Sequence, residues 1–132
     1  MTKIETLYIE TNKRNIRPFK KTAEAVGLNY EIVSPDKSLD IFLDNNSSVH
    51  YIIGEINKDE KQEHSLIEEI IKKIRDKNHR AKITIHSDNC NLLDLASRNK
   101  VYYQKRYTSS TGTLIRKILE SRELLHSKLL SI

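Results

Sequence analysis

Short apolar runs alternate along this chain with longer segments in which apolar residues recur every three or four positions. Each short run has the length and composition of a buried β-strand. A candidate helix follows every run, because the next segment has helical spacing. The pattern predicts five strands, at residues 7–9, Tyr30–Val33, 49–56, 82–86 and 101–104.

The first candidate helix carries apolar residues from Ile16 to Val26 and ends at Gly27. Because proline disfavours helical geometry in the residue before it, we expect regular helix to begin nearer Pro18 than Asn15. The helix at residues 64–77 has the clearest apolar stripe. This stripe consists of Ile67, Ile70, Ile71 and Ile74.

The remaining helices are less regular. Ser38 is expected to cap a short helix that carries Leu39, Phe42 and Leu43. Residues 91–99 predict another short helix, and a long closing helix is expected from residue 111 to about residue 130.

The order is therefore strand and helix repeated five times. Helical crossovers between strands favour a parallel sheet with helices on both faces. We predict an α/β fold, a flavodoxin-like (βα)5 doubly wound sandwich with a five-stranded parallel sheet. A chain of 132 residues has the size of one domain, 1–132. In such sheets functional residues collect at the carboxyl ends of the strands.

Composition narrows the functional classes. The net charge is +5, from 23 Lys and Arg against 18 Asp and Glu, but the cations are interleaved with acids, which is typical of solvated helix faces. One cysteine excludes a disulfide framework, and the five histidines lack metal-ligand spacing. No apolar run approaches the roughly 20 residues that a bilayer requires. We expect a soluble, cytoplasmic protein without a membrane partner or a metal.

Four short stretches at predicted strand ends together resemble the receiver domain of two-component response regulators (CheY-like). The resemblance covers essentially the whole chain, and its specificity comes from the order of the four stretches rather than from any one. They are Leu-Tyr-Ile-Glu-Thr-Asn from Leu7, Ile-Ile-Gly-Glu-Ile-Asn from Ile52, Ile-Thr-Ile-His-Ser from Ile83 and Tyr-Tyr-Gln-Lys-Arg-Tyr-Thr from Tyr102.

The resemblance implies a role for each strand end. In the family an aspartate attacks a phosphoryl group, acids on the first strand help to bind Mg²⁺, and a hydroxyl and a lysine contact the phosphoryl oxygens. Glu55 would occupy the phosphoacceptor position. Glu10 and Thr11 would occupy the metal-binding positions, and Ser87 and Lys105 the phosphoryl-contact positions.

The sequence departs from the family pattern at several positions. Glu55 is one methylene longer than the usual aspartate, and Thr11 supplies a hydroxyl in place of a second acid. Asp59 stands where the family usually has a proline. Arg106 replaces the proline that follows the lysine, usually through a cis bond. Because a non-proline cis bond costs about 3–4 kcal/mol, we expect the Lys105–Arg106 bond to be trans.

These departures reduce the negative charge of the site, from about −2 for three acids and one lysine to about −1 for Glu10, Glu55 and Lys105. A direct Glu55–Lys105 pair is then expected to replace metal and phosphate together. We predict a phosphorylation-independent pseudo-receiver that is not an enzyme and needs no cofactor. One alternative is a divergent receiver that binds Mg²⁺ and accepts phosphate on Glu55 or Asp59. Another is a basic nucleic-acid-binding module.

A pseudo-receiver acts through protein contacts. Tyr102 matches the family's switch aromatic, although it equally fits an ordinary half-buried strand residue. The apolar content of the closing helix continues to Ile132, and exposed apolar stripes usually mark contacts. The partner would be a kinase, an output domain or a second copy bound through this last helix, rather than nucleic acid.

Overall fold

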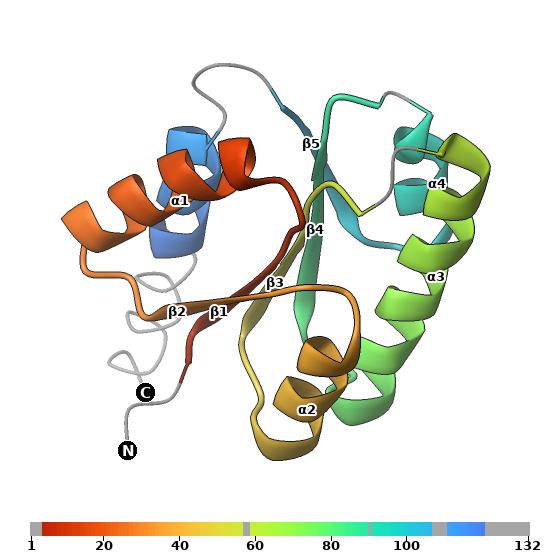
Figure 1. The fold of residues 1–132 in the computed structure, drawn as a ribbon, viewed down its shortest axis with the longest axis horizontal. Coiled ribbons are helices and arrows are strands. Elements are labelled where there is room, and N and C mark those ends of the chain that lie inside the picture. Colours follow the sequence, from red (N-terminus) through yellow and green to blue (C-terminus); the bar gives the residue numbers. More distant parts are fainter. Residues whose placement is uncertain (1–3, 57–58, 90, 107–110, 121–132) are drawn as a thin grey trace, which may run out of the picture.

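The computed structural model describes residues 4–56, 59–89, 91–106 and 111–120. Five parallel strands form one sheet in the order β2-β1-β3-β4-β5 (Figure 1). The strands are β1 (Thr6–Ile9), β2 (Tyr30–Val33), β3 (His50–Ile53), β4 (Lys82–Ser87) and β5 (Tyr102–Lys105). The predicted flavodoxin-like fold class is confirmed.

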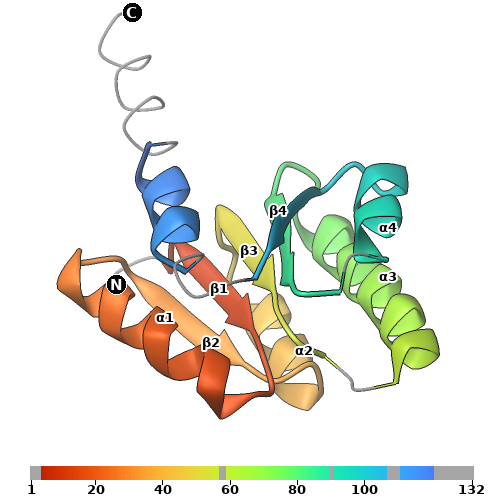
Figure 2. The same ribbon diagram turned by 90° about the horizontal axis from the view of Figure 1, so that it is seen from above.

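Helices cover both faces of the sheet. They are α1 (Lys13–Ala25), α2 (Lys37–Asn45), α3 (Glu60–Lys77), α4 (Leu92–Arg98) and the helical residues 111–120. Figure 2 shows α1 and the 111–120 helix on one side of the sheet and α2, α3 and α4 on the other. The expected extension of the closing helix to about residue 130 lies outside the described residues. Among the described residues, none of the helices combines the length and the apolar composition of a membrane-spanning segment.

Three helix starts differ clearly from the prediction, and α3 begins at Glu60, four residues before the expected residue 64. Helix α1 begins at Lys13, well before Pro18, because the Asn12 side chain caps it by accepting a hydrogen bond from the Arg14 amide at 3.0 Å. Pro18 is tolerated inside the helix, where it lies exposed. The cap of α2 is Asp36 rather than Ser38, since the Asp36 carboxylate accepts from the Ser38 amide at 2.8 Å.

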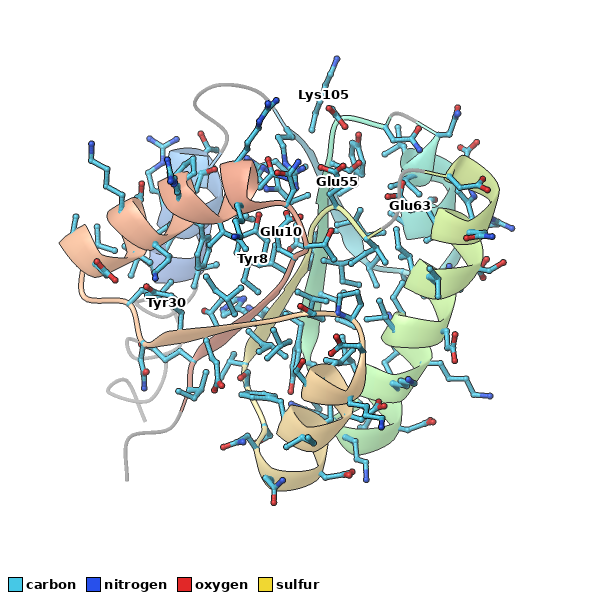
Figure 3. All side chains as sticks on the ribbon, in the orientation of Figure 1. Tyr8, Glu10, Tyr30, Glu55, Glu63 and Lys105 are labelled. Carbon is cyan, nitrogen blue, oxygen red and sulfur yellow. The ribbon has the colours of Figure 1, made fainter. Side chains whose placement is uncertain are left out.

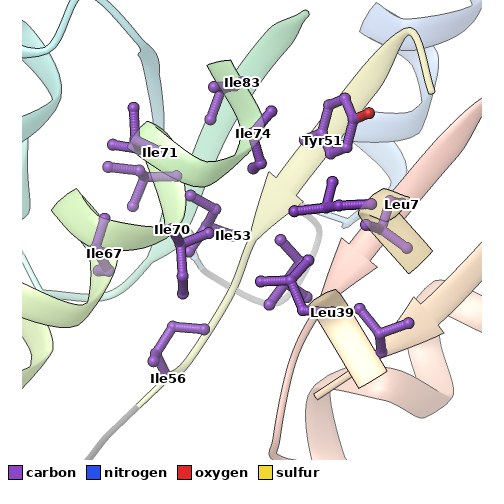
Figure 4. Packing of buried hydrophobic residues seen from close by; sticks show 14 of the residues in the cluster. Leu7, Leu39, Tyr51, Ile53, Ile56, Ile67, Ile70, Ile71, Ile74 and Ile83 are labelled. Atoms are coloured by element: carbon purple, nitrogen blue, oxygen red, sulfur yellow. The ribbon is translucent and has the colours of Figure 1, made fainter. Parts of the chain in front are cut away.

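Separate apolar layers fill the two faces. The larger layer lies between the sheet and α2, α3 and α4, and it buries the predicted isoleucine stripe of α3 (Figure 4). The smaller layer lies under α1 and the 111–120 helix, where the rings of Tyr8 and Phe19 pack at a tilt of 53° with centroids 4.4 Å apart. Burial of these side chains supplies the main favourable term for folding.

Strand register determines which residues meet at the carboxyl edge. Ile9 pairs with Ile53, so Glu10 and Gly54 follow side by side. Ser87 pairs with Lys105 on the other half of the sheet. The four stretches identified in the sequence therefore end along one edge of the sheet.

Candidate functional site

Three acidic or basic side chains meet at the carboxyl edge of the sheet: Glu10, Glu55 and Arg106. Glu10 follows β1 and is buried, whereas Glu55 follows β3 and is partly exposed. Figure 3 shows Glu10 and Glu55 near the same sheet edge and Lys105 extending away from it.

The Glu10 carboxylate is the centre of this arrangement, because it accepts hydrogen bonds from five donors. One oxygen accepts from the Tyr8 hydroxyl at 2.8 Å and from Arg106 Nη2 at 3.1 Å. The other accepts from three backbone amides, those of Thr11 at 3.1 Å, Asn12 at 3.2 Å and Glu55 at 3.0 Å. A carboxylate offers about four lone-pair sites, so that of Glu10 is saturated by protein donors.

Gly54 provides the space for this carboxylate. A Cβ at position 54 would lie 2.1 Å from Glu10 Oε1 and 3.0 Å from Tyr8 Cε1. The Gly54 amide also donates to the carbonyl of Ile9 at 2.8 Å, which holds the β1 and β3 ends together. A side chain at this position is therefore incompatible with the observed place of Glu10.

Arg106 supplies the positive charge that the sequence interpretation assigned to Lys105. Its guanidinium lies 3.1 Å from Glu10 and 3.8 Å from Glu55, and it also donates to the His86 carbonyl at 2.6 Å. The expected Glu55–Lys105 pair is wrong: the Lys105 side chain is exposed, and among the described residues the ion pair of Glu55 is with Arg106.

The alternation of side chains along a strand explains why Arg106, and not Lys105, pairs with the two acids. Side chains two residues apart point to the same face, so Arg106 lies on the face of Gln104, which is also the face of Tyr8 and Glu10. Lys105 is one position earlier, so its side chain points to the opposite face. The spacing of Gln104 and Arg106 in the sequence indicates this shared face, whereas the family pattern assigns the positive charge to the lysine at position 105.

Hydrogen bonds made by Thr11 and Glu55 connect the end of β1 to the end of β3. The Thr11 hydroxyl donates to the Glu55 carbonyl at 2.8 Å. The Glu55 carboxylate accepts from the side-chain amides of Asn12 at 2.9 Å and Asn15 at 3.3 Å. Sequence reasoning missed both asparagines, although their place at the start of α1, next to the sheet edge, follows from the predicted strand–loop–helix order.

The remaining predicted residues lie around this centre. The Ser87 hydroxyl accepts from the Asn89 amide at 3.0 Å, and the Ser87 carbonyl accepts from the Arg106 amide at 2.8 Å. The Lys105–Arg106 bond is trans, as expected. Tyr102 is 66% exposed at the start of β5, so it is a surface residue in this conformation.

A magnesium ion does not fit the donor set. Both oxygens of Glu10 are occupied, and a guanidinium lies beside it, where it would repel a cation. Thr11 directs its hydroxyl to a backbone carbonyl. Among the described residues, no group of three His, Cys, Asp or Glu side chains is arranged to hold a metal.

Burial changes the titration of two groups next to the network. The pKa of the Tyr8 hydroxyl is raised, mainly by burial and then by the neighbouring Glu10 charge, so Tyr8 remains a hydrogen-bond donor. The pKa of His86 is lowered to about 4 by burial and by the positive charge of Arg106. His86 is therefore neutral at neutral pH.

Because the pKa of His86 is lowered, we predict that the protein loses stability in acid. The unfolded chain binds the proton below about pH 6.5, and the folded chain binds it only near pH 4, so stability falls as the pH drops through that window. We expect His86 to account for a loss of about 2 kcal/mol between pH 7.5 and pH 5 in urea unfolding. His86→Gln should remove this part of the dependence and leave the part contributed by His50, whose pKa burial also lowers to about 4, whereas the exposed control His79→Gln should change it little; equal profiles for both variants would contradict the assignment.

Comparison with known proteins gives matches of fold rather than of sequence. No protein family and no curated protein matches the chain. A response regulator receiver domain protein (CheY-like) from Methanospirillum hungatei JF-1 has a TM-score of 0.71 at 13% identity, covering 96% of this chain and 99% of that one. A CheY-like protein (tadZ) from Pseudomonas aeruginosa PAO1 has a TM-score of 0.61 at 12% identity, covering 86% and 98%.

A designed protein shares the same architecture. The de novo designed Rossmann 2x3 fold protein has a TM-score of 0.70 at 19% identity, covering 89% of this chain and 90% of its own. At such identities the similarity establishes architecture alone. The chain thus has a receiver-like α/β fold, and its carboxyl edge carries a Glu10–Arg106–Glu55 network.

Proposed function

We propose that this protein is a non-enzymatic signalling domain of receiver type that acts in the cytoplasm by binding another protein, without phosphoryl transfer. The observation that supports this most directly is the position of Arg106, in contact with Glu10 and Glu55. A guanidinium is permanently charged and makes directed hydrogen bonds to carboxylates. It supplies the neutralising charge that a divalent cation would otherwise bring.

The same contacts disfavour Glu55 as a phosphoacceptor. Its carboxylate accepts from Asn12 and Asn15 and faces Arg106, so attack on a phosphoryl group would require these contacts to break. Without a metal position beside it, the charge that develops on the phosphoryl oxygens would lack its main stabilising partner. The edge is therefore suited to holding one conformation.

A surface for a protein partner lies near β5. Tyr102 is 66% exposed on the sheet face that the 111–120 helix covers, and Leu93 on α4 is 54% exposed on the other face, so the two side chains lie on either side of the β5 edge. Large exposed apolar side chains of this kind are frequent in contact surfaces. We propose this region, together with the closing helix, as the site for a kinase, an output domain or a second copy of the chain.

Incubation with a small-molecule phosphodonor tests the proposal. With acetyl phosphate and Mg²⁺, we expect intact-protein mass spectrometry to detect no stable phosphoryl adduct, because Glu10 lacks a free oxygen for the metal. A receiver with an aspartate acceptor serves as the positive control. A phosphoryl adduct that disappears in Glu55→Gln would overturn the proposal and favour the divergent phosphoacceptor.

A further inference from the structure

Helix α1 carries a block of positive charge that no acid interrupts. The helix has one acid, Glu24 in its last turn. Five basic residues precede this acid, and the side chains of all five are exposed. They are Lys13, Arg14, Arg17, Lys20 and Lys21. Among the described residues, none of these five forms an ion pair with an acid.

The helical repeat gathers the five cations into one stripe. At about 100° per residue, their side chains fall within an arc of about 120° and extend over about 12 Å of helix axis. The opposite arc carries Phe19 and Ala23, which are buried in the smaller apolar layer. Because α1 packs on the sheet through that arc, the cationic stripe faces solvent.

The charges of α1 are placed unfavourably for the helix itself. Lys13 and Arg14 lie in the first turn, where the partial positive charge of the helix end disfavours cations, and this turn has no acid. Arg17 is four residues from both Lys13 and Lys21, and like charges at this spacing repel each other. The stripe therefore opposes helix formation, which indicates a role other than folding.

Helix α3 shows the arrangement that is typical of a solvated face. It has five acidic and five basic residues, with Arg75 and Lys77 in its last turn. Its Lys73 pairs with Asp40 at 3.1 Å and Lys77 pairs with Asp44 at 3.2 Å. The interleaving of charges seen along the sequence thus holds for α3 but not for α1, so solubility alone does not account for the stripe.

The exposed side chains of α1 favour a polyanion over a protein surface. Protein interfaces depend on aromatic and apolar anchors and are depleted in lysine. Among the described residues, no large exposed apolar side chain lies between Lys13 and Ala25. A nucleic-acid duplex presents about one negative charge per 1.7 Å of its axis, so a stripe of about 12 Å faces several phosphates. The aromatic residue of α1, Phe19, is buried and offers no ring for the stacking that single strands require.

We propose that α1 binds the phosphate backbone of duplex nucleic acid, through its arginines and lysines and without reading the base sequence. Phe19 packs α1 against Tyr8 of β1 and Tyr30 of β2, with ring centroids 4.4 and 5.4 Å apart. These two strands lie at the end of the sheet away from β5. The inference therefore rests neither on the protein contact proposed around β5 nor on the Arg106 network.

Salt-dependent binding of a duplex tests the proposal. We expect the full chain to raise the fluorescence anisotropy of a labelled duplex DNA of arbitrary sequence, about 24 base pairs long, at 50 mM NaCl. The logarithm of the affinity falls with that of the salt concentration by about 0.9 for each phosphate contact. With about three to five contacts, the affinity should fall about 40- to 500-fold between 50 and 200 mM NaCl.

Two double variants separate the stripe from the overall charge. Arg17→Gln with Lys21→Gln should weaken binding at least about tenfold at 50 mM NaCl and reduce the salt slope by about 2. Glutamine keeps a high helix propensity, so α1 should stay folded. Lys37→Gln with Lys72→Gln is the matched control. It removes the same charge from exposed positions on α2 and α3, across the sheet from α1 (Figure 2), and should leave the slope unchanged.

Duplex RNA and polyglutamate are the comparison ligands. Similar salt-sensitive binding of duplex RNA would support recognition of the phosphate backbone alone, and binding of DNA alone would support a contact that fits the B-form backbone. Equally tight binding of polyglutamate, at the same concentration of charge, would overturn the proposal in favour of an acidic protein segment. No binding of either duplex at 50 mM NaCl, or an equal loss of affinity in the two double variants, would also overturn it.

Discussion

Replacement of Arg106 with methionine should lower the free energy of unfolding by about 3 kcal/mol, because it leaves the buried Glu10 carboxylate without its cation. Methionine keeps much of the side-chain length, so the loss of packing is small. The hydrogen bonds to Glu10 and to the His86 carbonyl are lost together. Urea unfolding at neutral pH measures the difference.

A second substitution separates the charge effect from a general loss of packing. In the Arg106→Met background, Glu10→Gln should restore part of the stability. Its amide oxygen can keep the three backbone donors while its amide nitrogen donates to the Tyr8 hydroxyl oxygen. Lys105→Met is the neighbouring control and should change stability little, since that side chain is exposed. Equal losses at positions 105 and 106 would refute the role of Arg106.

Gly54→Ala should lower the free energy of unfolding by about 3–4 kcal/mol, similar to Arg106→Met, although it adds only one methyl group. The new Cβ would lie 2.1 Å from Glu10 Oε1, so the carboxylate has to leave its place. Displacing it combines the cost of overpacking with the loss of several hydrogen bonds to a buried charge. Chemical denaturation provides the comparison.

Gly112→Ala is the matched control for this substitution. Position 112 is in the 111–120 helix, and an added Cβ there would meet no atom within 4 Å. Alanine should therefore stabilise the protein slightly, by about 0.5–1 kcal/mol, through its higher helix propensity. If Gly54→Ala were as well tolerated, the crowding between Gly54 and Glu10 would not be a constraint on this site.

Most of the architecture could be predicted from the sequence, because apolar periodicity is a local record of which faces are buried. The stripe from Ile67 to Ile74 and the run at Tyr30–Val33 correspond to α3 and β2. Helix starts were less predictable. Asn12 and Asp36 both cap a helix, and choosing among neighbouring polar residues requires the backbone geometry.

The site was predicted in outline but not in its pairing. Parallel topology brings Glu10 and Glu55 to one edge, which follows from strand order alone. Whether Lys105 or Arg106 pairs with these two acids depends on which face of β5 each side chain occupies. That in turn depends on how far the alternation of the strand continues past its last residue. The need for Gly54 depends on the path of the Glu10 side chain, which no spacing in the sequence encodes.

Glu10 and Arg106 are separated by 96 positions in the chain, so their contact encloses almost the whole fold. A nascent or truncated chain that lacks β5 and Arg106 would have to bury the Glu10 carboxylate, just after β1, without its cationic partner. A partly folded state with only the first four strands is therefore expected to be unstable. The contact that offsets the entropic cost of closing this long loop forms only when the last strand joins the sheet. Assembly of the sheet and completion of its charged edge become a single cooperative event.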